Sequence, residues 1–133
     1  MELHMARSYE ITVRDRTFIG MTASAVAQDE MLGLVGQAGI LPLLNSDESI
    51  SDMSKVTFMM TVPKNIRDRL AQLATRDLIK TDEGMPVAIN LFADNIQDWQ
   101  LLIIEALREN LGSFFTLSAH GNPAEDDLEE ATA

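Results

Sequence analysis

The segment from Ile96 to Leu111 constrains the fold more than any other part of this sequence, because it is too apolar for one-sided packing. Asp94 or Asn95 can cap a helix that begins at Ile96, and Gly112 can end it. At about 100° per residue, the apolar side chains cover about 200° of the helix circumference. These side chains are Ile96, Trp99, Leu102, Ile103, Ile104, Ala106, Leu107 and Leu111.

Two arrangements satisfy so wide an apolar face. We favour a central helix covered on two sides, because a helix that is apolar over most of its surface is usually buried. In the alternative, part of the face contacts another subunit or a partner. Leu101, which lies outside the arc, and the two phenylalanines after the helix would then belong to the same contact surface. The candidate contact residues are Trp99, Leu101, Ile104, Phe114 and Phe115.

The N-terminal segment has the signature of strands. Apolar and polar residues alternate from Tyr9 to Val13, and Thr17 to Ile19 is β-prone after a charged break. We expect a short β-hairpin, whose strands can pair within the chain or between copies. The second methionine directly after His4 suggests a cloning remnant, so we set residues 1–4 aside and expect the native start at Met5.

Three further helices are predicted before the apolar one. The first begins at a Thr22 or Ser24 cap and runs to about Val35, where a glycine-rich stretch is expected to end it. The others cover residues 50–60 and 64–79, the latter after a proline that suits a first helical turn. A turn at 80–86 and a short strand or extended connection at 87–92 follow.

Length and composition indicate one domain. The chain has 133 residues, of which 46% are hydrophobic, enough for a single core over residues 1–120. Residues 121–133 contain five acids and a single leucine, which predicts a disordered acidic tail. The expected class is mainly α (α+β), a compact helical domain of four to five helices with an N-terminal β-hairpin.

Charge is distributed unevenly. The net charge of −11 counts against nucleic acid and membrane surfaces as partners, because both would repel the protein. The predicted helix from Lys64 to Lys80 opposes this trend, since five basic and two acidic residues give it +3. Arg69, Arg76 and Lys80 lie on one flank, which is either solvated or a dock for an acidic surface such as the tail of a neighbouring copy.

Residues for catalysis or metal binding are scarce. The chain has no cysteine and two histidines, His4 in the set-aside terminus and His120 at the tail boundary. The carboxylate clusters Asp47-Glu48, Asp82-Glu83 and Asp126-Asp127 fall in predicted turns and in the tail, and neither a calcium loop nor a zinc-type histidine pair occurs. We therefore expect no enzymatic activity, no metal and no cofactor.

Methionine is frequent, with eight residues, and Met53, Met59 and Met60 lie close together. Such side chains fill irregular cores by default and also suit adaptable binding surfaces.

The order of these segments resembles the tail assembly chaperones of long-tailed (siphovirus-type) bacteriophages, over about Tyr9 to Phe115. Three parts carry the likeness: the β-prone opening that leads into TASAVAQDEML, the helix pair hinged at Val62-Pro63, and the final helix. In that family a final helix commonly closes with an asparagine and an aromatic pair, as Asn110 and Phe114-Phe115 do here.

The resemblance implies a protein that acts during tail assembly in the host cytoplasm and is absent from the mature virion. Such chaperones bind the tape measure protein, keep it soluble, and yield to the tail tube protein as it polymerises. It also implies a homo-oligomer and a longer frameshifted form that recruits tube subunits. The alternatives are a type III secretion-like chaperone and a virion part such as a head-tail connector or tail terminator.

Overall fold

The computed structural model describes the backbone of residues 6–45 and 50–132 and the side chains of residues 6–45 and 50–115, so the set-aside N-terminus lies outside it. The predicted mainly α (α+β) class is confirmed. In chain order the elements are β1 (Ser8–Val13), β2 (Arg16–Met21), α1 (Ala25–Ala38), α2 (Leu41–Asn45), α3 (Asp52–Met60), α4 (Lys64–Thr75), β3 (Ile79–Thr81), the 3-10 helix η1 (Ile89–Phe92) and α5 (Ile96–Thr132).

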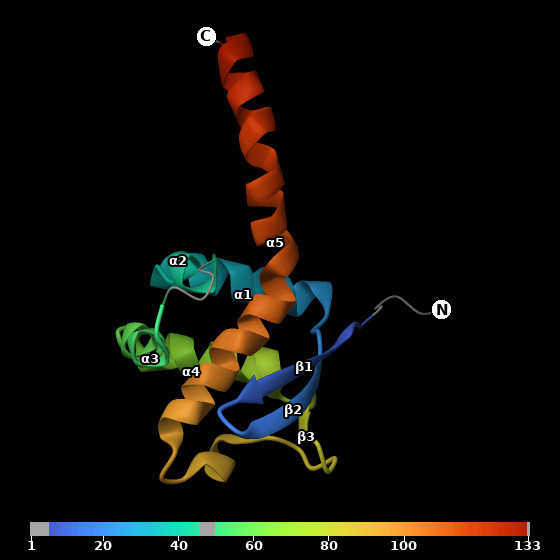
Figure 1. The fold of residues 1–133 in the computed structure, drawn as a ribbon, viewed down its shortest axis with the longest axis vertical. Helices are drawn as coiled ribbons and strands as arrows, with labels where there is room; N and C mark the ends of the chain where they lie inside the picture. Colours follow the sequence, from blue (N-terminus) through green and yellow to red (C-terminus); the bar gives the residue numbers. More distant parts are fainter. Residues whose placement is uncertain (1–5, 46–49, 133) are drawn as a thin grey trace.

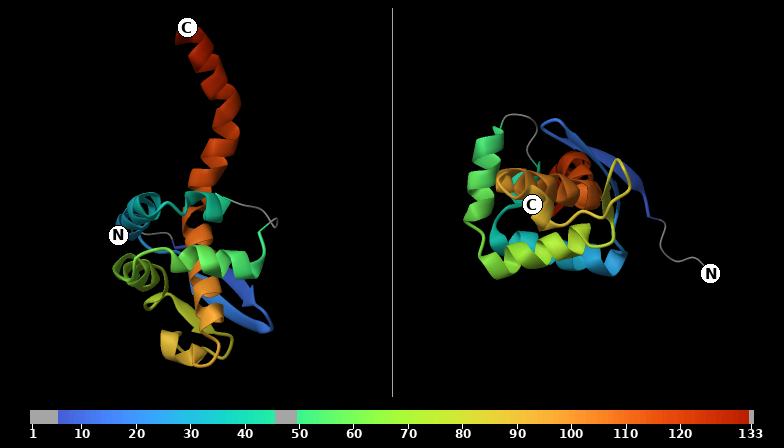
Figure 2. Two further views of the ribbon diagram at one scale, coloured as in Figure 1. Left: turned by 90° about the vertical axis from the view of Figure 1, so that its left-hand side faces the viewer. Right: turned by 90° about the horizontal axis from the view of Figure 1, so that it is seen from below.

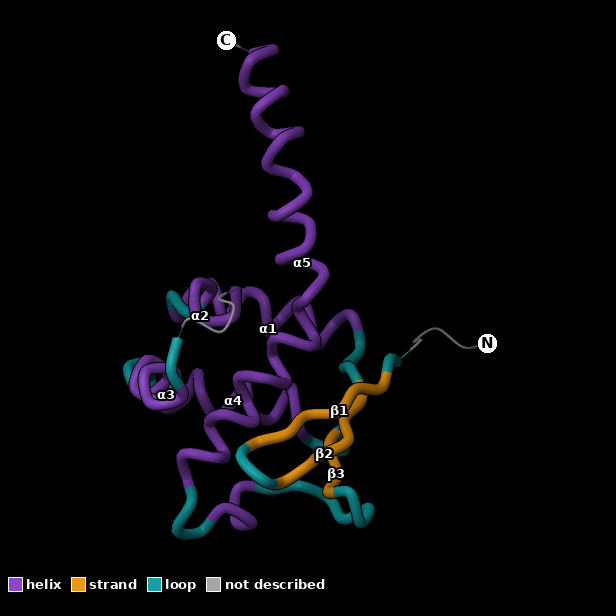
Figure 3. The backbone as a smooth tube through the Cα atoms, viewed as in Figure 1, coloured by secondary structure: helices purple, strands orange, loops and turns teal. Residues whose placement is uncertain are grey.

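Helix α5 passes through the middle of the domain, and the other elements surround its first half (Figure 1). The strands gather on one side of it and the shorter helices on the other (Figure 3). Seen along its length, α5 lies between the strands and α4, with α3 beside it (Figure 2). It contacts β1 and η1 as well as the four helices that precede it. The predicted central helix is therefore confirmed.

The predicted hairpin is confirmed and pairs within the chain. Strands β1 and β2 are antiparallel, with Ile11 opposite Phe18, and a two-residue turn at Arg14 and Asp15 joins them. Arg14 adopts a left-handed φ of 59°, as the tight hairpin turns that match strand twist require. Strand β3 extends the sheet to the order β1-β2-β3, a strand that the sequence analysis did not predict.

The third strand exists because α4 ends earlier than predicted. The helix ends at Thr75 instead of residue 79, and Asp77 takes a left-handed φ of 61°, which turns the chain away from the helix axis. Ile79 then pairs with Gly20 of β2, and its side chain is buried, at 1% exposure. Apolar spacing alone does not separate a last helical turn from a short buried strand.

The first helix is longer than predicted. Ser24 caps it, its Oγ accepting a hydrogen bond from the Ala27 N–H at 3.3 Å, and the helix continues through two glycines to Ala38. Gly39 ends it with a left-handed φ of 77°, a conformation that costs glycine little. The short helix α2 follows with a proline in its first turn.

The helix predicted to start near residue 50 starts at Asp52 behind a Ser51 cap, and the helix after Pro63 forms as predicted. The segment predicted as a strand or extended connection holds η1, which buries Phe92 completely.

The last helix does not end at Gly112. Its backbone continues to Thr132 and projects beyond the body of the domain (Figure 1). The predicted acidic tail, residues 121–133, forms the end of this projection as far as Thr132, and its side chains lie outside the described part. Alanine and glutamate, both good helix formers, are frequent in this stretch.

A buried asparagine fixes α5 to the sheet-to-helix connection. Asn110 is 6% exposed, and its Oδ1 accepts hydrogen bonds from the Ala23 N–H at 2.7 Å and the Gln28 amide at 3.3 Å. Its Nδ2 donates to the Ala106 carbonyl at 2.9 Å. Both ends of the amide are thus satisfied, which a buried polar side chain requires.

We predict that Asn110→Ala lowers the free energy of unfolding by about 1–3 kcal/mol, because it leaves the Ala23 N–H buried without its acceptor. Asn90→Ala, at an exposed position of η1, is the control and should change stability by less than about 0.5 kcal/mol. Urea denaturation measures both, and equal losses in the two variants would contradict the assigned role of Asn110.

Tyr9 has an unusual setting on the buried face of β1. Its ring lies over Gly20 on β2, where an added Cβ would come within 2.5 Å of the ring, and its hydroxyl has no hydrogen-bond partner among the described residues. Burial, followed by the nearby Glu109 carboxylate, raises the pKa of Tyr9 from 10.0 to about 12.

An absorbance titration of the phenol should therefore give a pKa of about 12 for the native protein, read without interference because Tyr9 is the one tyrosine of the chain. The unfolded protein in urea should titrate near pH 10. Since the folded-state pKa is the higher one, this group's stabilisation is fully present below pH 10 and is lost as the pH rises towards 12. A native midpoint near 10 would show that the ring is not buried.

Candidate functional site

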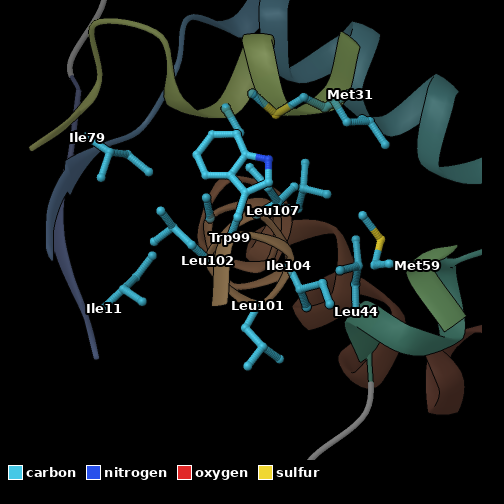
Figure 4. Packing of buried hydrophobic residues seen from close by; sticks show 14 of the residues in the cluster. Ile11, Met31, Leu44, Met59, Ile79, Trp99, Leu101, Leu102, Ile104 and Leu107 are labelled. Atoms are coloured by element: carbon cyan, nitrogen blue, oxygen red, sulfur yellow. The ribbon is translucent and has the colours of Figure 1, made fainter. Parts of the chain in front are cut away.

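The three candidates within the apolar helix are buried inside the chain. Trp99 and Leu101 are each 7% exposed and Ile104 is 0% exposed. Trp99 and Leu101 project to opposite sides of α5, and Ile104 faces Leu44 and Met59 from α2 and α3 (Figure 4). Ile104 therefore faces the interior of the domain, where α2 and α3 cover it. Trp99 and Leu101 each keep an edge on a groove described below. The contact role of these three residues stays a prediction.

The aromatic pair remains accessible. Phe114 is 38% exposed and Phe115 is half-buried, and their rings meet edge-on with centroids 5.2 Å apart. They form the last described turn of side chains on α5, where it leaves the domain.

The predicted basic flank does not form on one helix. Arg69 lies on α4 and makes a two-point contact with Glu30 of α1, at 2.7 and 2.8 Å. These hydrogen bonds hold the pKa of the Glu30 carboxyl below its usual value. Arg76 follows the end of α4 and Lys80 lies on β3, both exposed. The early end of α4 thus separates the three charges.

Two adjoining hollows follow α3 where it meets α4 and the first turns of α5. One has a volume of about 330 Å³ and the other about 440 Å³, and they share Val56 and Gln97. We name them together the α3 groove. Its apolar lining consists of Met53, Val56, Met60, Ala71, Ile89, Ile96, Trp99, Leu101 and Ile103.

Large apolar side chains stand open to solvent in the α3 groove. Met53 is 79% exposed, Met60 and Ile96 are each 50% exposed, and Ile89 is 48% exposed. Met53, Val56 and Met60 repeat at spacings of three and four residues, so they lie on one face of α3. Concave apolar surfaces of this kind are typical of binding sites, and methionine suits a site that adapts to its ligand.

Polar groups line both ends of the α3 groove. Near the start of α3 are Asp52, Arg14 and the buried Asp98, whose Oδ1 lies 3.3 Å from the Arg14 Nε. Near the end of α3 are Lys64 and Arg67 from the start of α4.

The sequence pattern indicates these residues only in part. Met53 and Met60 belong to the methionine cluster, for which core filling is the default interpretation. Ile96 belongs to the apolar arc, whose spacing does not separate the covered turns of α5 from the first, uncovered one. The signal that could have found the groove is the spacing of Met53, Val56 and Met60 on a helix with few other apolar residues.

Within the described residues, no group of three or more acidic or histidine side chains is placed to hold a metal ion. Among the same residues, no helix is both long enough and apolar enough to cross a membrane. No protein-family model, curated protein or solved structure matches this chain.

Proposed function

We propose that this protein is a tail assembly chaperone of a long-tailed bacteriophage. It binds the tape measure protein in the host cytoplasm, keeps it soluble, and gives way as tail tube subunits assemble. The observation that supports the proposal best is the α3 groove, an apolar surface left open beside an otherwise well packed core. The resemblance in segment order adds the identity of the client.

The physical requirements of such a chaperone agree with this chain. A long client with exposed apolar helices needs an apolar partner surface, which the α3 groove offers on a fixed frame. The complex must also stay dispersed, and a net charge of −11 on every bound copy favours mutual repulsion of coated clients. The proposal involves binding alone, without an enzymatic step or a cofactor.

Further parts of the proposal concern assembly. Several copies coat one client, a longer frameshifted form recruits tail tube subunits, and no copy stays in the finished virion. Phe114 and Phe115, exposed and half-buried where α5 leaves the domain, are candidates for contacts between copies.

The test is co-expression with a phage tape measure protein, followed by measurement of the soluble client. We predict that Met53→Asp lowers the client affinity roughly tenfold, or about 1.4 kcal/mol, because it places a charge in the apolar contact. Val26→Asp is the matched control. Val26 is the second residue of α1, as Met53 is of α3, and it is 81% exposed but lies outside the α3 groove.

Both variants add an acid to a first helical turn, where it favours the helix, so neither should unfold the domain. The control should solubilise the client as well as the native protein does. A client that is equally insoluble with and without this protein would refute the chaperone function. Equal activity of the two variants would refute the α3 groove as the contact surface.

A further inference from the structure

The two ends of the α3 groove carry opposite charge. Asp52 and Asp98 lie near the start of α3, with Arg14 as their one basic neighbour in the lining. Lys64 and Arg67 lie near its end, with Asp68 as their one acidic neighbour. The nine residues of α3 span about 14 Å, or roughly two and a half turns of a bound helix.

Asp98 is the most informative group at the acidic end. Its side chain is only 5% exposed, yet its Oδ1 has no hydrogen bond within the described part of the chain, although the Arg14 Nε lies 3.3 Å away. Arg14 itself is 58% exposed and approaches from the hairpin turn. A buried carboxylate with a single, misaligned partner favours a further cation at this end.

The basic end has unused donors. The Arg67 Nε donates to the Val62 carbonyl at 3.0 Å, whereas its two terminal amino groups have no partner among the described residues. Lys64 contacts Asp68 at 2.7 Å, but both side chains are exposed, so a competing carboxylate can replace this weak pair. Arg76 lines an adjoining hollow that shares Asp68, Ala71, Ile89 and Trp99 with the α3 groove.

We infer that the α3 groove binds one amphipathic helix of the client in a single orientation, selected by charge. The apolar stripe of the bound helix packs on Met53, Val56 and Met60. Acidic residues at one end of it face Lys64 and Arg67, and a basic residue at the other end faces Asp98. This inference rests on the proposed function and adds the chemistry of the segment that is recognised.

Charge selects the orientation because the reversed helix would place acids against Asp52 and Asp98 and a base against Lys64 and Arg67. Juxtaposed like charges penalise the wrong arrangement, while the apolar contact is nearly the same in both. On a long client with many helices, such selection would align successive copies in one direction.

The experiment compares two helical peptides with the same composition and the same apolar stripe. In the polarised peptide, lysines occupy one end and glutamates the other; in the mixed peptide, each end carries both. Trp99 lines the groove and is the single tryptophan of the chain, so its fluorescence reports binding directly. We expect the polarised peptide to bind roughly tenfold tighter at low salt, with the difference shrinking as salt is added.

Lys64→Glu should reduce this preference to less than about threefold, because it reverses a charge at the basic end. Lys80→Glu makes the same change at an exposed position of β3 outside the groove, and should leave the preference intact. Glutamate suits the first turn of α4, so the Lys64 variant should keep its fold.

Equal affinity of the two peptides for the native protein, or no binding of either, would overturn the inference. If the client is nevertheless solubilised, the chaperone function stands and only the charge selection fails. Light scattering tests whether a second copy of this protein occupies the groove instead. If the native protein self-associates, Lys64→Glu abolishes that association and neither peptide binds, the groove belongs to another copy. This result would likewise overturn the inference.

Discussion

The burial of α5 on nearly all sides between Asp98 and Leu111 is the constraint on which the rest of the domain depends. Leu102, Ile104 and Leu107 have no solvent exposure, and they face different neighbours because they point in different directions from the helix axis. A single layer of helices could not cover so wide a face, so the sheet must close one side while α1 to α4 close the other. The hairpin, although small, is therefore essential to the core.

Two polar features fix how these layers meet. Asn110 joins the start of α1 to α5 by hydrogen bonds at both ends of its amide. Arg16 lies over the rings of Phe18 and Phe92, with its guanidinium carbon 5.4 and 4.9 Å from their centroids, and Phe92 contacts Trp99 with ring centroids 5.5 Å apart. Sheet, η1 and α5 thus share one aromatic cluster.

The cover around α5 is incomplete at its first turn, and the α3 groove arises there. Ile96 and Met60 remain half exposed, and both line the α3 groove. The same helix that organises the core thus supplies the floor of the proposed client site.

Much of the fold could be predicted from local patterns, and the departures have local causes. Alternation from Tyr9 to Val13 is enough to identify a strand, and the apolar arc is enough to place α5 at the centre. The end of α4 depends on the extended backbone of Arg76 and the left-handed backbone of Asp77, which no apolar spacing reports.

The site was predicted less well than the fold. Leu101 looked exposed on a helical wheel because its neighbours Asp98 and Glu105 are charged. Asp98, however, is buried beside Arg14, and Glu105 lies 3.8 Å from the buried Lys55. Ion pairs with Arg14 and Lys55, which are distant in the sequence, thus cover a face of α5 that a helical wheel shows as polar.

Amide hydrogen exchange on the complex with the tape measure protein locates the surface that binds the client. We expect client binding in the α3 groove to slow exchange in α3 and in the first turns of α5, while the exchange of β1 stays unchanged. Protection confined to the sheet, with α3 exchanging as fast as in the free protein, would contradict binding in the groove.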